Sequence, residues 1–75
     1  REIAMEEFAF LALRTATGID RRRFEKRFGV PLDSIYADAI AKLKRQSLLA
    51  EDAAGVRLTE LGMKYGNMAF EEFLL

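Results

Sequence analysis

The chain has 75 residues, and its 12 basic and 12 acidic side chains cancel at neutral pH. It contains neither cysteine nor histidine, which excludes disulfides, thiolate zinc sites and iron–sulfur ligation by cysteine within this chain. A domain that grips nucleic acid through phosphates usually carries a basic excess, which is absent here, and no apolar run approaches the roughly 20 residues of a membrane span.

The first predicted element is a helix from Glu2 to about Thr15, because this segment lacks glycine and proline. Its stretch from Phe8 to Leu13 contains no polar residue. Six residues cover more than one helical turn, so every side of the helix is apolar there. We expect this helix to be buried on more than one side.

A short second helix is predicted from Arg21 to Phe28. Gly18 is suited to end the first helix, and Asp20 is suited to be the N-cap of the second. Gly29 fits the position just after the helix, and Pro31 prevents easy continuation. A third helix is predicted from Asp33 to about Gln46, because apolar residues recur there at helical spacing.

Two short apolar runs, 48–51 and 56–58, flank a turn that starts with Asp52 and ends with Gly55. This pattern predicts a small β-hairpin. Thr59 is suited to cap a last helix, predicted from Glu60 to about Phe73. That helix has two apolar stripes, which suggests contact with more than its own core. The stripes are Met63, Gly66, Phe70 and Phe73, and Leu61, Tyr65 and Met68.

The order of these elements predicts a mainly α, winged-helix-like domain with three helices, a short β-hairpin wing and a C-terminal helix. DNA binding or protein interaction is the alternative function that such a fold raises. The leading part of the third helix carries Asp33 and Asp38, which phosphates would repel. Nucleic acid is therefore not the favoured partner.

The second predicted helix holds a cluster of five bases in an otherwise neutral chain. These are Arg21, Arg22, Arg23, Lys26 and Arg27. Such a patch could meet phosphates, an acidic partner surface or the propionate carboxylates of a tetrapyrrole. The plainer interpretation is a solvated helix face, partly balanced by neighbouring acids.

No catalytic, cofactor-binding or metal-binding constellation is evident in the sequence. Ser34 and Ser47 have no histidine to activate them. Several methionines and tyrosines are conceivable axial ligands of heme, but their helical spacing favours core packing. They are Met5, Met63, Met68, Tyr36 and Tyr65.

An ordered set of residues along nearly the whole chain resembles the C-terminal domain of oxygen-independent coproporphyrinogen III oxidase-like proteins, which are radical-SAM proteins. Its first half is Glu7-Phe8, Leu13-Arg14, Gly18-Ile19-Asp20, Phe24 and Phe28-Gly29. Its second half is Tyr36, Leu43, Leu48-Leu49, Leu58-Thr59, Gly62, Asn67, Phe70 and Phe73-Leu74. Ser47 departs from the pattern, because a glycine commonly precedes the Leu-Leu pair.

The resemblance implies a larger cytoplasmic parent in which residues 1–75 form a single C-terminal accessory domain without a catalytic centre. The start at Arg1, without a leader, agrees with this expectation. The parent would carry a radical-SAM barrel whose three cysteines hold a [4Fe–4S] cluster that binds S-adenosylmethionine. Some members decarboxylate coproporphyrinogen III in porphyrin biosynthesis, and others are heme chaperones; the residues do not choose between them. None of the cluster ligands lies in this chain.

Excess apolar surface on the first and last helices suggests that the domain docks on the parent's barrel and helps to shape its substrate end. The predicted docking surface consists of Phe8, Phe10, Leu11, Leu13, Phe70 and Phe73.

Overall fold

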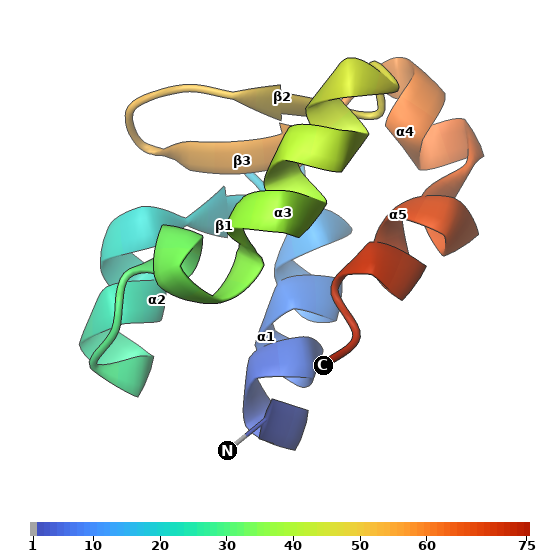
Figure 1. Cartoon of the computed structure of the whole chain (residues 1–75). Coiled ribbons are helices and arrows are strands. Elements are labelled where there is room, and N and C mark those ends of the chain that lie inside the picture. Colours follow the sequence, from blue (N-terminus) through green and yellow to red (C-terminus); the bar gives the residue numbers. More distant parts are fainter. Residues whose placement is uncertain (1) are drawn as a thin grey trace.

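The computed structural model describes residues 2–75, which form five helices around a small antiparallel sheet (Figure 1). The predicted order of elements is confirmed, with additions. The elements are α1 Glu2–Leu13, β1 Ile19–Asp20, α2 Arg21–Phe28, α3 Leu32–Arg45, β2 Leu49–Glu51, β3 Gly55–Leu58, α4 Glu60–Lys64 and α5 Gly66–Glu72.

The sheet has the strand order β1-β3-β2, with both pairs antiparallel. Strands β2 and β3 form the predicted hairpin, in which Leu49 pairs with Leu58. Strand β1 was not predicted, and it pairs Ile19 with Val56. In Figure 1 the hairpin extends to one side beyond β1, so that it forms the wing of a winged-helix-like fold.

Local hydrogen bonds explain the bounds of α2. The Asp20 side chain accepts from the backbone N–H of Arg23 at 3.0 Å, as predicted for an N-cap. Gly29 adopts a left-handed conformation with φ of 75°, and its N–H donates to the carbonyl of Glu25 at 2.7 Å. The predicted range of α2 is confirmed.

Helix α1 ends at Leu13, two residues before its predicted end. The Thr15 hydroxyl donates to the Ala12 carbonyl at 2.6 Å, so the chain turns there. The sequence suggested that Gly18 ends α1, but Gly18 lies five residues beyond the end of that helix. It has φ of 71°, and a side chain there would lie 2.0 Å from the Val56 carbonyl oxygen. This glycine therefore allows the loop to approach β3 closely.

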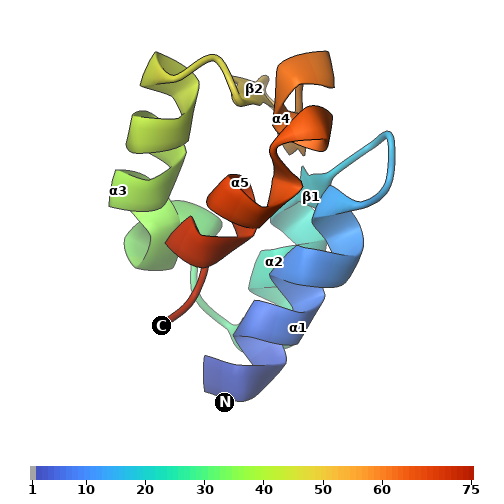
Figure 2. The same cartoon turned by 90° about the vertical axis from the view of Figure 1, so that its right-hand side faces the viewer.

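The expected burial of α1 on more than one side is confirmed. The Phe8 ring makes edge contacts with Phe24 and Phe28 of α2, at centroid distances of 5.8 and 5.6 Å. On another side of α1, Phe10 lies 5.7 Å from Phe70 of α5. Figure 2 shows α5 lying between α3 and α1. The apolar stretch is therefore used largely within the domain.

The predicted single C-terminal helix is wrong. The chain breaks at Tyr65, whose φ of −111° and ψ of 40° lie outside helical values, and the helices on either side are α4 and α5. Thr59 caps α4 as predicted, because its hydroxyl accepts from the N–H of Gly62 at 3.0 Å. The break turns Ala69 and Phe73 into the core, where both are fully buried.

The core lies between the helices and the inner face of the sheet. Its largest fully buried side chains are aromatic and aliphatic. They include Phe24, Tyr36, Phe73, Leu13, Ile19, Leu32, Leu43 and Val56. The third helix presents its predicted stripe to this core, with a kink at Tyr36. Within residues 2–75, no helix has the length and apolar character needed to cross a membrane.

Candidate functional site

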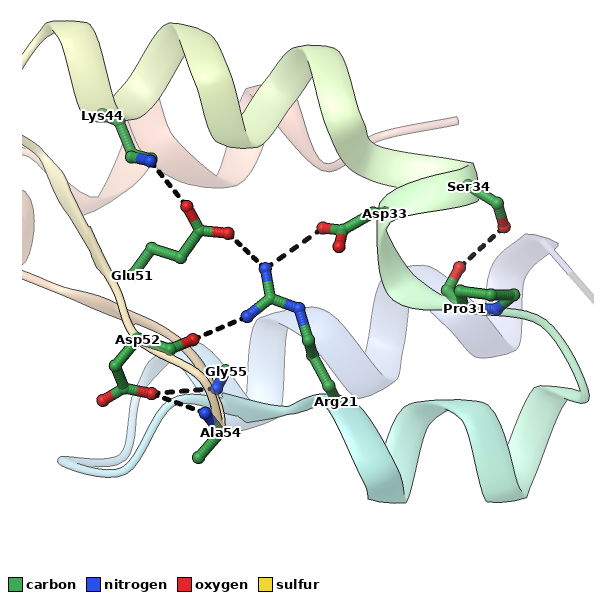
Figure 3. Close-up of polar contacts among 9 residues, drawn as sticks. All are labelled: Arg21, Pro31, Asp33, Ser34, Lys44, Glu51, Asp52, Ala54 and Gly55. Carbon is green, nitrogen blue, oxygen red and sulfur yellow. Dashed lines mark hydrogen bonds and ion pairs between the residues drawn. The ribbon is translucent and has the colours of Figure 1, made fainter.

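The structure divides the predicted basic cluster of α2. Arg21 turns toward the wing, where its guanidinium pairs with Glu51 and with Asp33, the latter at 3.2 Å (Figure 3). It also donates to the Asp52 carbonyl at 2.7 Å. Lys44 of α3 reaches the other oxygen of Glu51 at 2.5 Å. Arg21 therefore ties α2 to the hairpin and to α3.

This network shifts the pKa values of its members. Lys44 and then Arg21 donate to Glu51 and hold the pKa of that carboxyl below its ordinary value. Hydrogen bonding to Asp33, and more weakly to Glu51, raises the pKa of Arg21. These partly exposed pairs contribute little to folding individually. Their clearest effect is that Arg21 is already engaged and does not belong to a free anion-binding patch.

The other four bases of α2 remain exposed: Arg22, Arg23, Lys26 and Arg27. Within residues 2–75, none of them forms an ion pair. The guanidinium of Arg27 lies over two aromatic rings, 5.4 Å from the centroid of Phe28 and 6.0 Å from that of Phe8. This contact fixes the position of Arg27 beside α1.

A groove of about 710 Å³ lies between α1, α2 and the hairpin. We call it the α1–α2 groove. One side of the groove comes from α1 and another from the start of α2. The α1 side contains Ala4, Glu7, Phe8, Leu11 and Ala12, and the α2 side contains Arg23 and Arg27 beside the N-cap Asp20, so the groove carries both signs of charge.

The hairpin supplies an ion pair to the same groove. Arg57 and Asp52 pair at 3.0 Å, so this arginine is neutralised locally. Backbone N–H groups of Gly55 and Ala54 donate to Asp52 and lower the pKa of its carboxyl. The hairpin side of the groove therefore offers no net positive charge to a ligand, although Arg57 is a base of the predicted wing.

A second surface lies on α4 and α5, and we call it the α4–α5 face. Its four apolar side chains are about half exposed: Leu61 (44%), Met63 (48%), Tyr65 (45%) and Met68 (51%). A groove of about 590 Å³ runs along this face and is bounded by Arg14 and Phe70. The guanidinium of Arg14 lies 5.7 Å from the Phe70 ring. The sequence signal for this surface was the second apolar stripe of the last predicted helix.

The residues of the predicted docking surface do not share one face. Leu13 and Phe73 have 0% exposure, so the core holds them and they are not available to a partner. Phe8, Phe10 and Phe70 are half-buried against their neighbours. Leu11 alone among the six is exposed, at 64%, and it lines the α1–α2 groove.

The conceivable heme ligands are also dispersed. Met5 and Tyr36 are buried in the core, whereas Met63, Tyr65 and Met68 are exposed on the α4–α5 face. The part of the chain that the structure describes holds no cluster of three or more His, Cys, Asp or Glu side chains suited to a metal. The chain's lack of cysteine does not fit a [4Fe–4S] cluster held by thiolates.

Comparisons with known proteins agree with the family expected from the residue pattern. Residues 1–65 match the family described as HemN C-terminal domain. The chain is 37% identical over 71 residues to heme chaperone HemW of Lactococcus lactis subsp. lactis, which covers 95% of this chain and 19% of that protein. It is 33% identical over 73 residues to heme chaperone HemW of Bacillus subtilis, with 97% and 19% covered.

The chain thus spans about a fifth of the length of these curated relatives. No solved structure matches it significantly. The family match covers residues 1–65 and so includes α1 to α4 and the wing, whereas α5 lies beyond it. On this evidence the chain belongs to the HemN C-terminal domain family.

Proposed function

We propose that the chain is a non-catalytic accessory domain of a longer radical-SAM protein of the oxygen-independent coproporphyrinogen III oxidase-like family, serving porphyrin biosynthesis or heme delivery. Membership of the HemN C-terminal domain family supports this proposal. So does the likeness to two proteins named as heme chaperones, each about five times longer than the matched region. The iron–sulfur cluster and S-adenosylmethionine would then be held by the rest of the protein.

The α4–α5 face is the surface through which we expect the domain to dock on the parent's barrel. The observation that carries this step is the exposure of four apolar side chains of α4 and α5 at 44–51%, of which Met63, Tyr65 and Met68 line one groove. Contiguous apolar surface of this kind commonly marks a contact with another protein surface. The remaining four-fifths of the relatives' length supplies a large surface within the same polypeptide. This location keeps the last predicted helix as part of the docking surface but replaces the residues expected there and on α1, of which Leu13 and Phe73 are fully buried.

The docked domain would then help to shape the substrate end of the parent. Arg14 and Lys64, which bound the groove on the α4–α5 face, give its rim a positive charge. A complementary surface on the barrel would be apolar at its centre and acidic at its edge.

The charges of α3 support this function over DNA binding. Lys42 pairs with Glu72 at 2.8 Å, and Lys44 pairs with Glu51. Asp33 lies exposed at the start of the helix, where a recognition helix would meet phosphates. We expect no saturable binding of duplex DNA at physiological salt.

The test compares Leu61→Glu and Met68→Glu in the full-length parent with the control Ile3→Glu. Ile3 is more exposed, at 72%, and lies on α1 away from the α4–α5 face. Limited proteolysis between barrel and domain should accelerate in the two α4–α5 variants and not in the control. Circular dichroism of the 75-residue chain with each substitution checks that the fold is retained. Equal proteolysis of all variants and the wild type would contradict the docking role.

A further inference from the structure

The α4–α5 face holds both exposed methionines of the chain. The sequence has three methionines and no cysteine. Met63 and Met68 are 48% and 51% exposed, whereas Met5 is 3% exposed in the core. In a chain without thiols, the thioethers are the sulfur groups that a peroxide can oxidise. The two thioether side chains that a dissolved oxidant can reach therefore lie on the surface proposed for docking.

The break at Tyr65 brings these two methionines into one groove. They are five positions apart, which on a continuous helix would place them about 140° apart around the axis. The backbone of Tyr65 is not helical, so α4 ends before it and α5 begins after it. Met63 and Met68 both line the groove of about 590 Å³ on the α4–α5 face. A chemical change at either methionine therefore alters the same surface.

We propose that Met63 and Met68 form an oxidation site, at which hydrogen peroxide converts the thioethers to sulfoxides and so releases the domain from the parent's barrel. This inference rests on the proposed docking role of the α4–α5 face. A thioether is an apolar and adaptable contact. A sulfoxide oxygen buried against the apolar centre of the barrel surface lacks a donor, which disfavours the docked state.

The oxidation needs no reagent besides the peroxide. A lone pair of the sulfur attacks one peroxide oxygen, and an S–O bond forms as the O–O bond breaks. The second oxygen takes up the proton of the first and leaves as water. The sulfur is oxidised by two electrons, and the peroxide is reduced by the same two.

The first measurement maps the oxidation in the 75-residue chain. Hydrogen peroxide is added to the folded chain, circular dichroism checks the fold, and mass spectrometry of its peptides locates each added oxygen atom. Met63 and Met68 should both be oxidised. Met5 should react at least about ten times more slowly, because its thioether is reached only when the core opens. In urea, where the core is open, all three should react at similar rates.

The second measurement follows docking in the full-length parent. Peroxide should accelerate limited proteolysis between barrel and domain about five-fold or more, the effect expected of a buried polar group without a partner. The double variant Met63→Leu and Met68→Leu lacks the site and should show no acceleration. Met5→Leu, a volume-conserving change in the core, should respond like the wild type. Each protein is compared with its own untreated sample, which removes any effect of the substitution on docking itself.

The change should also be reversible. Methionine sulfoxide reductases restore the thioether with a dithiol, whose oxidation to a disulfide releases the sulfoxide oxygen as water. Treatment of the oxidised parent with these enzymes should return cleavage to the slow rate of the untreated sample. Fast cleavage that persists after both thioethers are restored would contradict the proposal.

Selective oxidation of Met63 and Met68, with faster cleavage that the double variant lacks, supports the proposal. Equally fast oxidation of Met5 in the folded chain overturns it. So does equal acceleration in the wild type and the double variant, or unchanged cleavage once both sulfoxides have formed. The docking role is tested without peroxide through Leu61→Glu and Met68→Glu. If these variants accelerate cleavage and peroxide does not, the oxidation site fails alone; if they do not, docking itself fails.

Discussion

The hydroxyl of Tyr36 is expected to weaken the fold, and its removal gives a sharp test of the core. Tyr36 is 2% exposed, and its oxygen has no hydrogen-bond partner within the described residues. A buried polar group without a partner keeps the cost of leaving water, which is about 1–3 kcal/mol. The ring itself packs on Phe24 and Phe73 and is preserved in phenylalanine. We therefore expect Tyr36→Phe to raise the free energy of unfolding by up to about 1 kcal/mol at pH 7.

The same hydroxyl predicts a dependence on alkaline pH. Burial, assisted by the negative charge of Glu6, raises the pKa of Tyr36 from 10.0 to about 12. Between these values the unfolded chain releases the proton before the folded chain does, so the stability falls as the pH rises. The loss should reach about 1.3 kcal/mol at pH 11 and about 2–3 kcal/mol above pH 12.

Urea unfolding followed by circular dichroism at pH 7, 9, 10 and 11 measures both effects. In Tyr36→Phe the free energy of unfolding should lack this part of its fall at alkaline pH. In Tyr65→Phe, where the substituted side chain is exposed, the free energy of unfolding should fall as it does in the wild type. The difference between the variants removes every contribution that the wild type and the variants share. Parallel pH profiles for Tyr36→Phe and the wild type would refute the reasoning. So would destabilisation by more than about 1 kcal/mol at pH 7, because it would indicate a hydrogen-bonded hydroxyl.

Two further predictions concern the C-terminal helices. Gly62→Ala should lower the free energy of unfolding by more than about 2 kcal/mol, because the new Cβ would lie 2.0 Å from the Leu48 carbonyl oxygen. The control Gly66→Ala, whose Cβ would make only ordinary contacts, should stay within about 1 kcal/mol of the wild type in thermal unfolding. Phe73→Ala should cost about 3–5 kcal/mol, because the fully buried ring leaves a cavity; a loss below 1 kcal/mol by urea unfolding would show that α5 is not part of the core.

Elements specified by local chemistry were predictable from the sequence. The bounds of α2 follow from Asp20 and Gly29, since a cap and a left-handed glycine act on neighbouring residues. Strand β1 could not be predicted in the same way, because it has only two residues and is a strand only through its pairing with β3. Its existence depends on partners more than 30 positions away, which local patterns do not report.

The break at Tyr65 shows how an apolar pattern can be assigned to the wrong face. Two apolar stripes fit one continuous helix, and Gly66 was the only local sign of an interruption. Once the chain bends, Phe73 belongs to the core and Met63 and Met68 are left exposed. The candidate docking surface in the structure therefore differs from the predicted one. The prediction chose the most apolar segments of the sequence, whereas the structure shows which apolar side chains tertiary packing leaves exposed.

The basic cluster was predicted as a unit because its members are adjacent in sequence. Arg21 separates from it because the hairpin, 30 residues later, brings Glu51 within reach of its guanidinium. The remaining bases divide again, since Arg23 and Arg27 face the groove while Arg22 and Lys26 do not line it. Only a fold can decide which charges of one helix act together.

The all-apolar stretch of α1 is explained by three different contacts around one helix. Ala9 and Leu13 enter the core, Phe10 packs on α5, and Phe8 and Leu11 face the α1–α2 groove. Two of these contacts are satisfied inside the domain, and only the third leaves a large exposed side chain. Leu11, at 64% exposure, is therefore the part of the stretch that the fold does not use, and a single exposed apolar side chain of this kind is compatible with folding alone.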